Sequence, residues 1–209
     1  MKTDALIELL ARGAGPAPRG VVGRRLAWAA ALGLVCSAAL ALGLWGTLPS
    51  ATYATAVPWV KLACAAVLAG TGGWLTSQLA RPASRWGWPC IAVAVVWASV
   101  LGGASLIGPM PSLQDEASAG HRGYGCPWNV LALSLPALAC LLWAVRGLAP
   151  TRARAAGAAA GLTAGALGAL GYSLTCPEVS PVFAAAGYTL GIGAAALLGC
   201  LLGPRTLRW

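Results

Sequence analysis

Six long apolar stretches follow one another along the chain, separated by short polar segments. They cover residues 26–47, 57–79, 89–107, 127–145, 155–175 and 181–202. Each is close to the ~20 residues that an α-helix needs to cross a ~30 Å hydrocarbon core. Apolar residues occupy odd and even positions alike, unlike the alternating ~10-residue strands of a membrane β-barrel. The pattern predicts an all-α polytopic membrane protein with a bundle of six transmembrane helices.

Composition agrees with a surface that faces lipid. Of the 209 residues, 58% are hydrophobic and 9% are charged, whereas a globular domain has roughly 25% charged residues. The chain has ten Trp and four Tyr but one Phe. Most of these aromatic residues lie near the ends of the apolar stretches, where amphipathic rings favour the lipid headgroup layer.

Basic residues predict the orientation. Twelve of the fourteen Lys and Arg lie in the N-terminal tail, the second and fourth loops and the C-terminus. The first loop has no charge, the third has Arg122 with Asp115 and Glu116, and the fifth has Glu178 alone. By the positive-inside rule, both termini are cytoplasmic and the odd loops face outward. The twelve are Lys2, Arg12, Arg19, Arg24, Arg25, Arg81, Arg85, Arg146, Arg152, Arg154, Arg205 and Arg208.

The net charge of +9 is therefore explained by membrane orientation. The basic residues are scattered over several loops and do not form one stripe, so direct binding of nucleic acid is not expected. Lys61 is the one charged residue inside an apolar stretch. It lies near the outer end of that stretch, and we expect its side chain to extend outward to the interface.

Small residues at four-residue spacing mark the last two stretches. Because such a stripe lets two helix backbones come into contact in lipid, it predicts close packing of these helices. Packing within the chain is favoured over a dimer interface. The stripes are Gly157, Gly161 and Gly165 in one stretch, and Gly187, Gly191, Ala195, Gly199 and Gly203 in the other.

Few side chains are suited to catalysis or transport. The chain has one histidine, His121, so a site built on paired histidines is not available within one subunit. No acidic residue lies inside an apolar stretch, whereas ion-coupled transporters usually keep ionisable groups at mid-membrane. His121, Asp115 and Glu116 share the third loop and could add metal ligands, but a solvated loop is the simpler interpretation. We do not expect an enzyme.

Two of the seven cysteines stand apart from the apolar stretches. Cys126 immediately precedes the fourth stretch, in Gly125-Cys126-Pro127-Trp128, and Cys176 follows the fifth, in Thr175-Cys176-Pro177-Glu178. Both are expected at the outer interface as exposed thiols. They could form a disulfide, which needs Cα atoms within about 7 Å, respond to oxidants, bind a soft metal ion, or be unrelated. A metal ion bound there would be transient, and no resident cofactor is expected.

The tail over residues 1–25 contains a short amphipathic segment, and residues 26–209 form the transmembrane domain. Thr3 can cap a helix, and Asp4 and Glu8 suit its early turns. A helix of this length is marginal alone, so it should pack against the bilayer surface, the bundle or a partner protein. Its apolar face consists of Leu6, Ile7, Leu9 and Leu10.

Several of these features resemble the NrsF family, the negative regulators of sigma F. The resemblance spans nearly the whole chain. It rests on the opening Met1-Lys2-Thr3-Asp4, on the Cys-Pro pairs at Cys126 and Cys176 with Cys176-Pro-Glu-x-Ser-Pro181, and on the ending from Tyr188-Thr-Leu-Gly191 to Arg208-Trp209.

The resemblance implies a function. Members of the family are inner-membrane anti-sigma factors that hold an extracytoplasmic-function sigma factor inactive and release it under stress, including heavy-metal stress. It implies that Cys126 and Cys176 sense the signal, by metal binding or oxidation, and that the N-terminal segment contacts the sigma factor. Loops carrying Arg81, Arg85, Arg152 and Arg154 could share that contact.

Two other functions remain as alternatives. A membrane thiol oxidoreductase would pass electrons between outer cysteines and a quinone. Such enzymes generally use two redox pairs, often Cys-x-x-Cys, and that motif does not occur here. A small transporter is the other alternative, and the lack of charges at mid-span argues against it.

Overall fold

The computed structural model describes residues 20–47, 57–81, 87–107, 122–148, 150–176 and 181–207, together with Thr3, Asp4, Tyr53, Ile7 and Glu8. Within this part of the chain the regular structure is helical, with six long helices, as the sequence predicts. The helices are α2 (Val21–Trp45), α3 (Val57–Leu79), α4 (Gly87–Ile107), α6 (Arg122–Arg146), α7 (Ala153–Ser173) and α8 (Pro181–Thr206).

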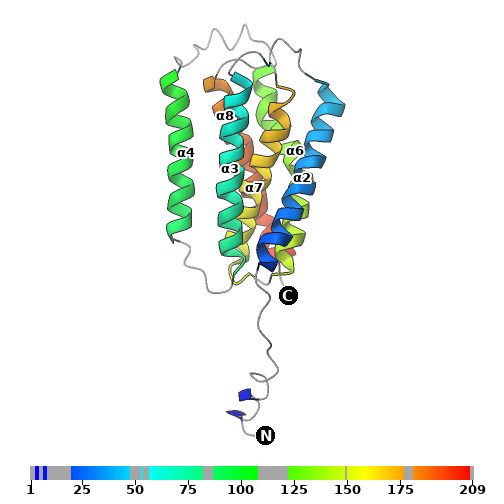
Figure 1. Cartoon of the computed structure of the whole chain (residues 1–209), viewed down its shortest axis with the longest axis vertical. Coiled ribbons are helices and arrows are strands. Elements are labelled where there is room, and N and C mark those ends of the chain that lie inside the picture. The colour runs from blue at the N-terminus through cyan, green and yellow to red at the C-terminus, as the bar shows by residue number, and fades with distance from the viewer. Residues whose placement is uncertain are drawn as a thin grey trace.

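The six helices run up and down in one bundle, and α7 lies at its centre (Figure 1). Helix α7 packs against α2, α3, α6 and α8, while α4 stands at the side and contacts α3 and α8. Helix α2 begins at the same end of the bundle at which α8 ends (Figure 1). An even number of passes along the bundle follows from this arrangement.

Local sequence signals explain several helix ends. Gly46 follows α2 with a φ of 74°, a left-handed conformation that glycine adopts without strain, and its N–H donates to the Leu42 carbonyl at 2.9 Å. Pro181 opens α8, where its missing N–H costs nothing. Arg146 and Arg205 lie in the last turns of α6 and α8, where a positive charge complements the helix dipole.

Part of the predicted small-residue stripes brings α7 and α8 into backbone contact within one chain, whereas Gly187 and Gly191 face α6. A side chain on Gly157 would collide with the Gly199 backbone, and one on Gly199 would collide with Gly157. About two turns further along, a side chain on Gly165 would come within 2.8 Å of the Ile192 Cα. The absence of side chains therefore allows the approach of these helices, which dispersion forces then stabilise.

Two buried clusters fill the bundle. One lies near the start of α2 and includes Leu26, Val145 and Leu207. The other lies toward the opposite end of the helices and includes Ala41, Val130 and Ile192. Alanine and glycine make up most of the buried positions of α7, so the central helix occupies little volume and its neighbours approach closely.

A side chain of α2 donates a hydrogen bond to α6 in the turn before a proline. Pro136 lacks the N–H that would continue the ladder, and its ring crowds the preceding turn. The hydroxyl of Ser37, fully buried on α2, donates to the Leu133 carbonyl in that turn at 2.6 Å. The carbonyl that loses its partner to Pro136 is that of Ala132, four residues earlier, so the Ser37 bond links α2 to the adjacent carbonyl and does not replace the missing one.

The structure corrects two expectations. Helix α6 begins at Arg122, so Cys126 lies inside its first turns and does not precede the helix. Lys61 is buried, with 8% of its surface exposed, so the expected outward extension of its side chain is wrong. Hydropathy places Lys61 near an interface, but it does not show on which face of α3 the side chain lies.

Within the described residues, four helices are long and apolar enough to cross a membrane: Val21–Trp45, Gly125–Arg146, Ala153–Ser173 and Ala185–Thr206. In the described part of α4, the apolar stretch is shorter, Cys90–Ser99. Helix α3 carries Lys61, Thr71 and Thr76, and these polar residues lower its mean hydropathy.

Candidate functional site

Two thiols and two phenols meet near the end of the bundle that is opposite to the start of α2. Cys126 comes from the first turns of α6, Tyr172 from the last turn of α7, Cys176 from just beyond α7, and Tyr188 from α8. All four side chains belong to one buried cluster. We call these four residues the thiol–tyrosine cluster.

Cys126 is held between α7 and α8. Its Sγ lies 3.6 Å from the Tyr172 hydroxyl, at hydrogen-bonding distance for sulfur. A Cβ on Gly187 would lie 3.1 Å from the Cβ of Cys126, so this glycine makes room for the thiol. Six per cent of the Cys126 surface is exposed.

Cys176 is fixed by the turn that ends α7. Its backbone N–H donates to the Tyr172 carbonyl at 3.0 Å, and the N–H of Thr175 donates to the same oxygen at 3.0 Å. Four per cent of its surface is exposed. The backbone that positions Cys176 is therefore the backbone of Tyr172, whose hydroxyl contacts Cys126.

The tyrosine rings join the parts of the site. The Tyr172 and Tyr188 ring centres lie 6.1 Å apart, and the Trp45 ring stands edge-on to Tyr172 at 5.9 Å. The Asn129 amide donates to the Tyr172 hydroxyl at 3.3 Å. Tyr172 thus contacts side chains of α2, α6 and α8.

The sequence prediction for the thiols is correct in one respect and wrong in another. Cys126 and Cys176 do belong to one buried cluster at the same end of the bundle. The expectation of exposed thiols is wrong, because both are buried beneath aromatic side chains. All seven cysteines lie in the described part of the chain, and no disulfide joins any of them.

The cluster offers few ligands to a metal ion. Among the described residues, no group of three or more His, Cys, Asp and Glu side chains is placed to hold a metal. His121, Asp115 and Glu116 lie outside the described residues. Two cysteines alone are fewer ligands than the four that a structural tetrahedral zinc site uses.

Three members of the site were not predicted. Tyr172, Tyr188 and Asn129 lie in apolar helices, and aromatic residues there are expected at the headgroup layer. The available signal is spacing, since Tyr172 precedes Cys176 by four residues and Asn129 follows Cys126 by three. Residues so spaced share a helix face.

The predicted sigma-binding residues fall mostly outside the structural description. Leu6, Leu9 and Leu10 lie outside the described residues. Ile7 is described with a helical backbone, and 59% of its surface is exposed. The Ile7 side chain is therefore not covered by the bundle.

Comparison with known proteins gives a consistent result. A family model with the description "Negative regulator of sigma F" matches residues 10–209. The anti-sigma-F factor NrsF of Caulobacter vibrioides is 38% identical over 216 residues, and the probable anti-sigma-F factor NrsF of Azospira oryzae is 35% identical over 215 residues. Both alignments cover all of both chains. No solved structure matches this chain.

Proposed function

Starting from the fact that this chain belongs to the NrsF family of negative regulators of sigma F, we propose that it is a membrane-bound anti-sigma factor. It would hold an extracytoplasmic-function sigma factor inactive at the bacterial inner membrane. The observation that carries this proposal is similarity over the full length to two anti-sigma-F factors. The family's role is regulatory and not enzymatic, which removes the oxidoreductase alternative.

Six membrane spans with both termini in the cytoplasm are part of the proposal. Helices α3 and α4 expose large apolar side chains, among them Trp59 and Val67 on α3 and Ile91 and Val95 on α4. Such faces are stable against lipid and unfavourable in water. The shared end of α2 and α8 carries most of the Arg residues, so the positive-inside rule places that end in the cytoplasm.

Exposed tryptophans support the same placement. Trp28, Trp88 and Trp143 are each more than 70% exposed and lie in the halves of α2, α4 and α6 nearest the basic end. Trp59 and Trp128 are exposed near the opposite ends of α3 and α6. Two levels of exposed indole rings are typical of the two interfaces of a bilayer.

Signal sensing is assigned to Cys126 and Cys176. An oxidant such as peroxide would take two electrons and two protons from the thiols, join the sulfurs in a disulfide and be reduced to water. A soft metal ion would displace both protons and bridge the sulfurs. Either bond changes the distance between the start of α6 and the end of α7, and the contacts of Tyr172 would pass this change to α2 and α8.

The sigma-binding surface is assigned to the cytoplasmic side. Leu6, Ile7, Leu9 and Leu10 would insert their apolar face into a groove of the sigma factor. Ile7 is exposed, as a binding residue must be. Arg81 and Arg154 are also exposed at this end. A signal that weakens sigma-factor binding by about 1.4 kcal/mol would raise the dissociation constant tenfold.

The sensing role is tested by replacing the two thiols. In cells with a sigma-dependent reporter, Cys126→Ser with Cys176→Ser should repress the reporter normally and fail to release it on cadmium or peroxide. The matched control is Cys64→Ser, a half-buried thiol of α3 outside the cluster, which should respond like the wild type. Normal release by the double variant would refute the sensing role.

The binding role is tested separately by co-purification. Detergent-solubilised full-length protein should retain the sigma factor, and a variant lacking residues 1–20 should lose it. The truncated protein could instead retain the sigma factor and lose it only on Arg81→Glu with Arg154→Glu. That result would assign the binding site to the loops and not to the tail.

A further inference from the structure

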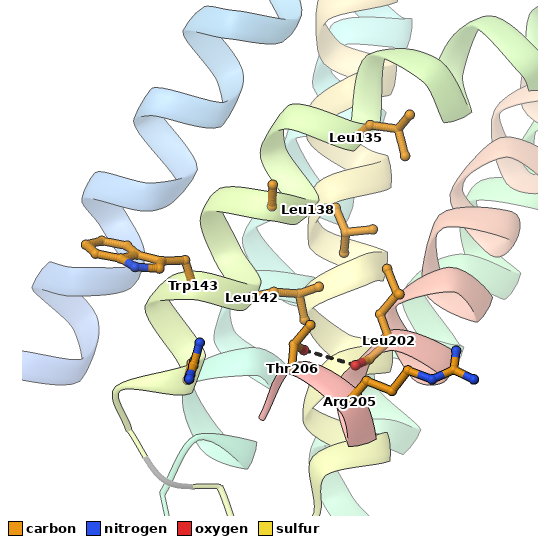
Figure 2. Close-up of a pocket in the computed structure, with 9 residues that line it drawn as sticks. Leu135, Leu138, Leu142, Trp143, Leu202, Arg205 and Thr206 are labelled. Carbon is orange, nitrogen blue, oxygen red and sulfur yellow. Dashed lines mark hydrogen bonds between the residues drawn. The ribbon is translucent and has the colours of Figure 1, made fainter. Parts of the chain in front are cut away.

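Two open grooves lie on either side of Trp143 at the basic end of the bundle. The first runs between α6 and α8, has a volume of about 560 Å³ and is lined by Leu138, Leu142 and Leu202 (Figure 2). The second runs between α2 and α6, has a volume of about 670 Å³ and is lined by Trp28 and Leu32, among others. Ala139 and Trp143 line both grooves.

Arginines surround the end of each groove. Arg146 and Arg205 line the first groove, and Arg24 and Arg25 line the second. Figure 2 shows Arg205 extending from the last turn of α8 beside Thr206 and Leu202. Among the described residues that line the two grooves, none is acidic. Four positively charged side chains therefore lie at one end of the two apolar grooves, where they favour the binding of an anion.

The length of the first groove corresponds to one leaflet. Leu135 and Arg146 both line it and lie on the same helix. Eleven residues of α-helix span about 16 Å, and half of a ~30 Å hydrocarbon core is about 15 Å. With Arg146 at the depth of the headgroups, Leu135 would lie near the middle of the membrane.

The guanidinium group of Arg25 is held in place before any ligand binds. It lies over the Trp143 ring, 5.4 Å from the ring centre, in a cation–π contact. It also lies against Gly147, where any side chain would collide with it. A cation fixed in this way loses little conformational freedom when it binds a phosphate.

We infer that these two grooves bind an anionic glycerophospholipid of the cytoplasmic leaflet, with its phosphate at the four arginines and its acyl chains on either side of Trp143. The inference rests on the membrane placement proposed above. Trp143 and Leu135 are largely exposed, so a lipid can enter sideways from the bilayer. Basic pockets between helices on the cytoplasmic side suit acidic lipid headgroups.

Native mass spectrometry of the full-length protein tests the headgroup site. The probes are phosphatidylglycerol and phosphatidylcholine with identical acyl chains. The wild type should retain phosphatidylglycerol in preference, and Arg146→Gln with Arg205→Gln should lower that preference about tenfold. The matched control is Arg81→Gln with Arg154→Gln, which removes the same charge from exposed positions outside the grooves and should retain the two lipids in the same ratio as the wild type.

The acyl-chain site is tested by filling it. Ala139→Trp places a ring in both grooves and should abolish retention, while Ala132→Trp, on the exposed part of α6 beyond both linings, should not. Three results would overturn the inference. The wild type could retain the two lipids equally, or the target and control variants could lose lipid equally. In the third result, the occupant that Ala139→Trp displaces is a second copy of the chain. Failure of membrane insertion would appear independently, as extraction of the protein by alkaline carbonate.

Discussion

Burial determines how Cys126 and Cys176 can take part in sensing. Both thiols lie beneath Tyr172 and Tyr188 and have almost no contact with solvent. A reagent or metal ion must therefore wait for a local opening, and the free energy of that opening sets the rate of reaction. Sensing at this site would depend on the packing of the two rings as much as on thiol chemistry.

The first prediction concerns the rate of thiol labelling. The test compares two proteins: one keeps only Cys126 and Cys176, and the other has Trp128→Cys as its single cysteine. An impermeant maleimide should react with the first protein at least about tenfold more slowly, because an opening cost of about 1.4 kcal/mol slows the reaction tenfold. Trp128 lies two residues from Cys126, and 72% of its surface is exposed. Rates are measured by mass shift on solubilised protein.

The comparison has an internal control. In denaturant the buried and the introduced thiols should react at similar rates, because packing no longer protects either. Equal rates in the native protein would show that the thiol–tyrosine cluster is open at rest.

These residues also show what the sequence could and could not predict. The Cys-Pro pairs at Cys126 and Cys176 place two sulfurs at one end of neighbouring helices, and the structure agrees. Their burial depends on Tyr172 and Tyr188, and on Gly187, which leaves space beside Cys126. That information lies in how the helices are rotated, which hydropathy does not report.

At the scale of the element, α6 accepts a hydrogen bond from α2 in the turn before Pro136. Ser37→Ala removes the hydroxyl that donates to the Leu133 carbonyl at 2.6 Å. It should lower the free energy of unfolding by about 1 kcal/mol, a cost within the range for bonds between membrane helices. The measurement is an SDS titration of the protein in mixed micelles.

Ser99→Ala provides the comparison for this change. The Ser99 hydroxyl donates to Val95 within its own helix and is exposed, so its loss should have almost no effect. A similar cost for both variants would mean that Ser37 does not support the turn before Pro136.

The α7–α8 contact gives a larger expected effect. Gly161→Leu should destabilise the protein by about 3 kcal/mol, because its side chain would meet the Ala196 Cα at 2.8 Å and has no space to rotate away. Gly193→Leu is the matched control, since nothing lies within 4 Å of that position. Thermal unfolding of the two variants should differ clearly, and equal stability would contradict the close helix contact.

Element length was predicted well, and element face was predicted only where glycines mark a helix contact. The stretch 57–79 agrees with the bounds of α3, and the glycine spacing identified the surfaces that join α7 and α8. The start of α6 lies five residues before the predicted stretch, because Gly125 and Pro127 are typical of a loop in sequence. Tertiary packing against α7 and α8 extends the helix through them.

For the whole molecule, charge and hydropathy provide different information about the spans. In the part of the chain that the structure describes, length and hydropathy identify four helices that can cross a membrane. The up-and-down arrangement of six helices, with α2 beginning where α8 ends (Figure 1), allows six crossings. It also allows four crossings, if α3 and α4 both stay on one side of the membrane. The decisive question is therefore whether α3 crosses.

Cysteine accessibility in intact cells answers this question. In a protein without other cysteines, Trp59→Cys at the start of α3 should react with an impermeant maleimide, and Arg81→Cys just beyond its end should react only after the cells are opened. Arg154→Cys serves as the cytoplasmic control and Trp128→Cys as the outer one. Lys61 does not prevent the crossing, since its burial among the helices removes it from lipid. Labelling of Trp59→Cys and Arg81→Cys from the same side would reduce the bundle to four crossings and leave α3 and α4 as a hairpin on one side of the membrane.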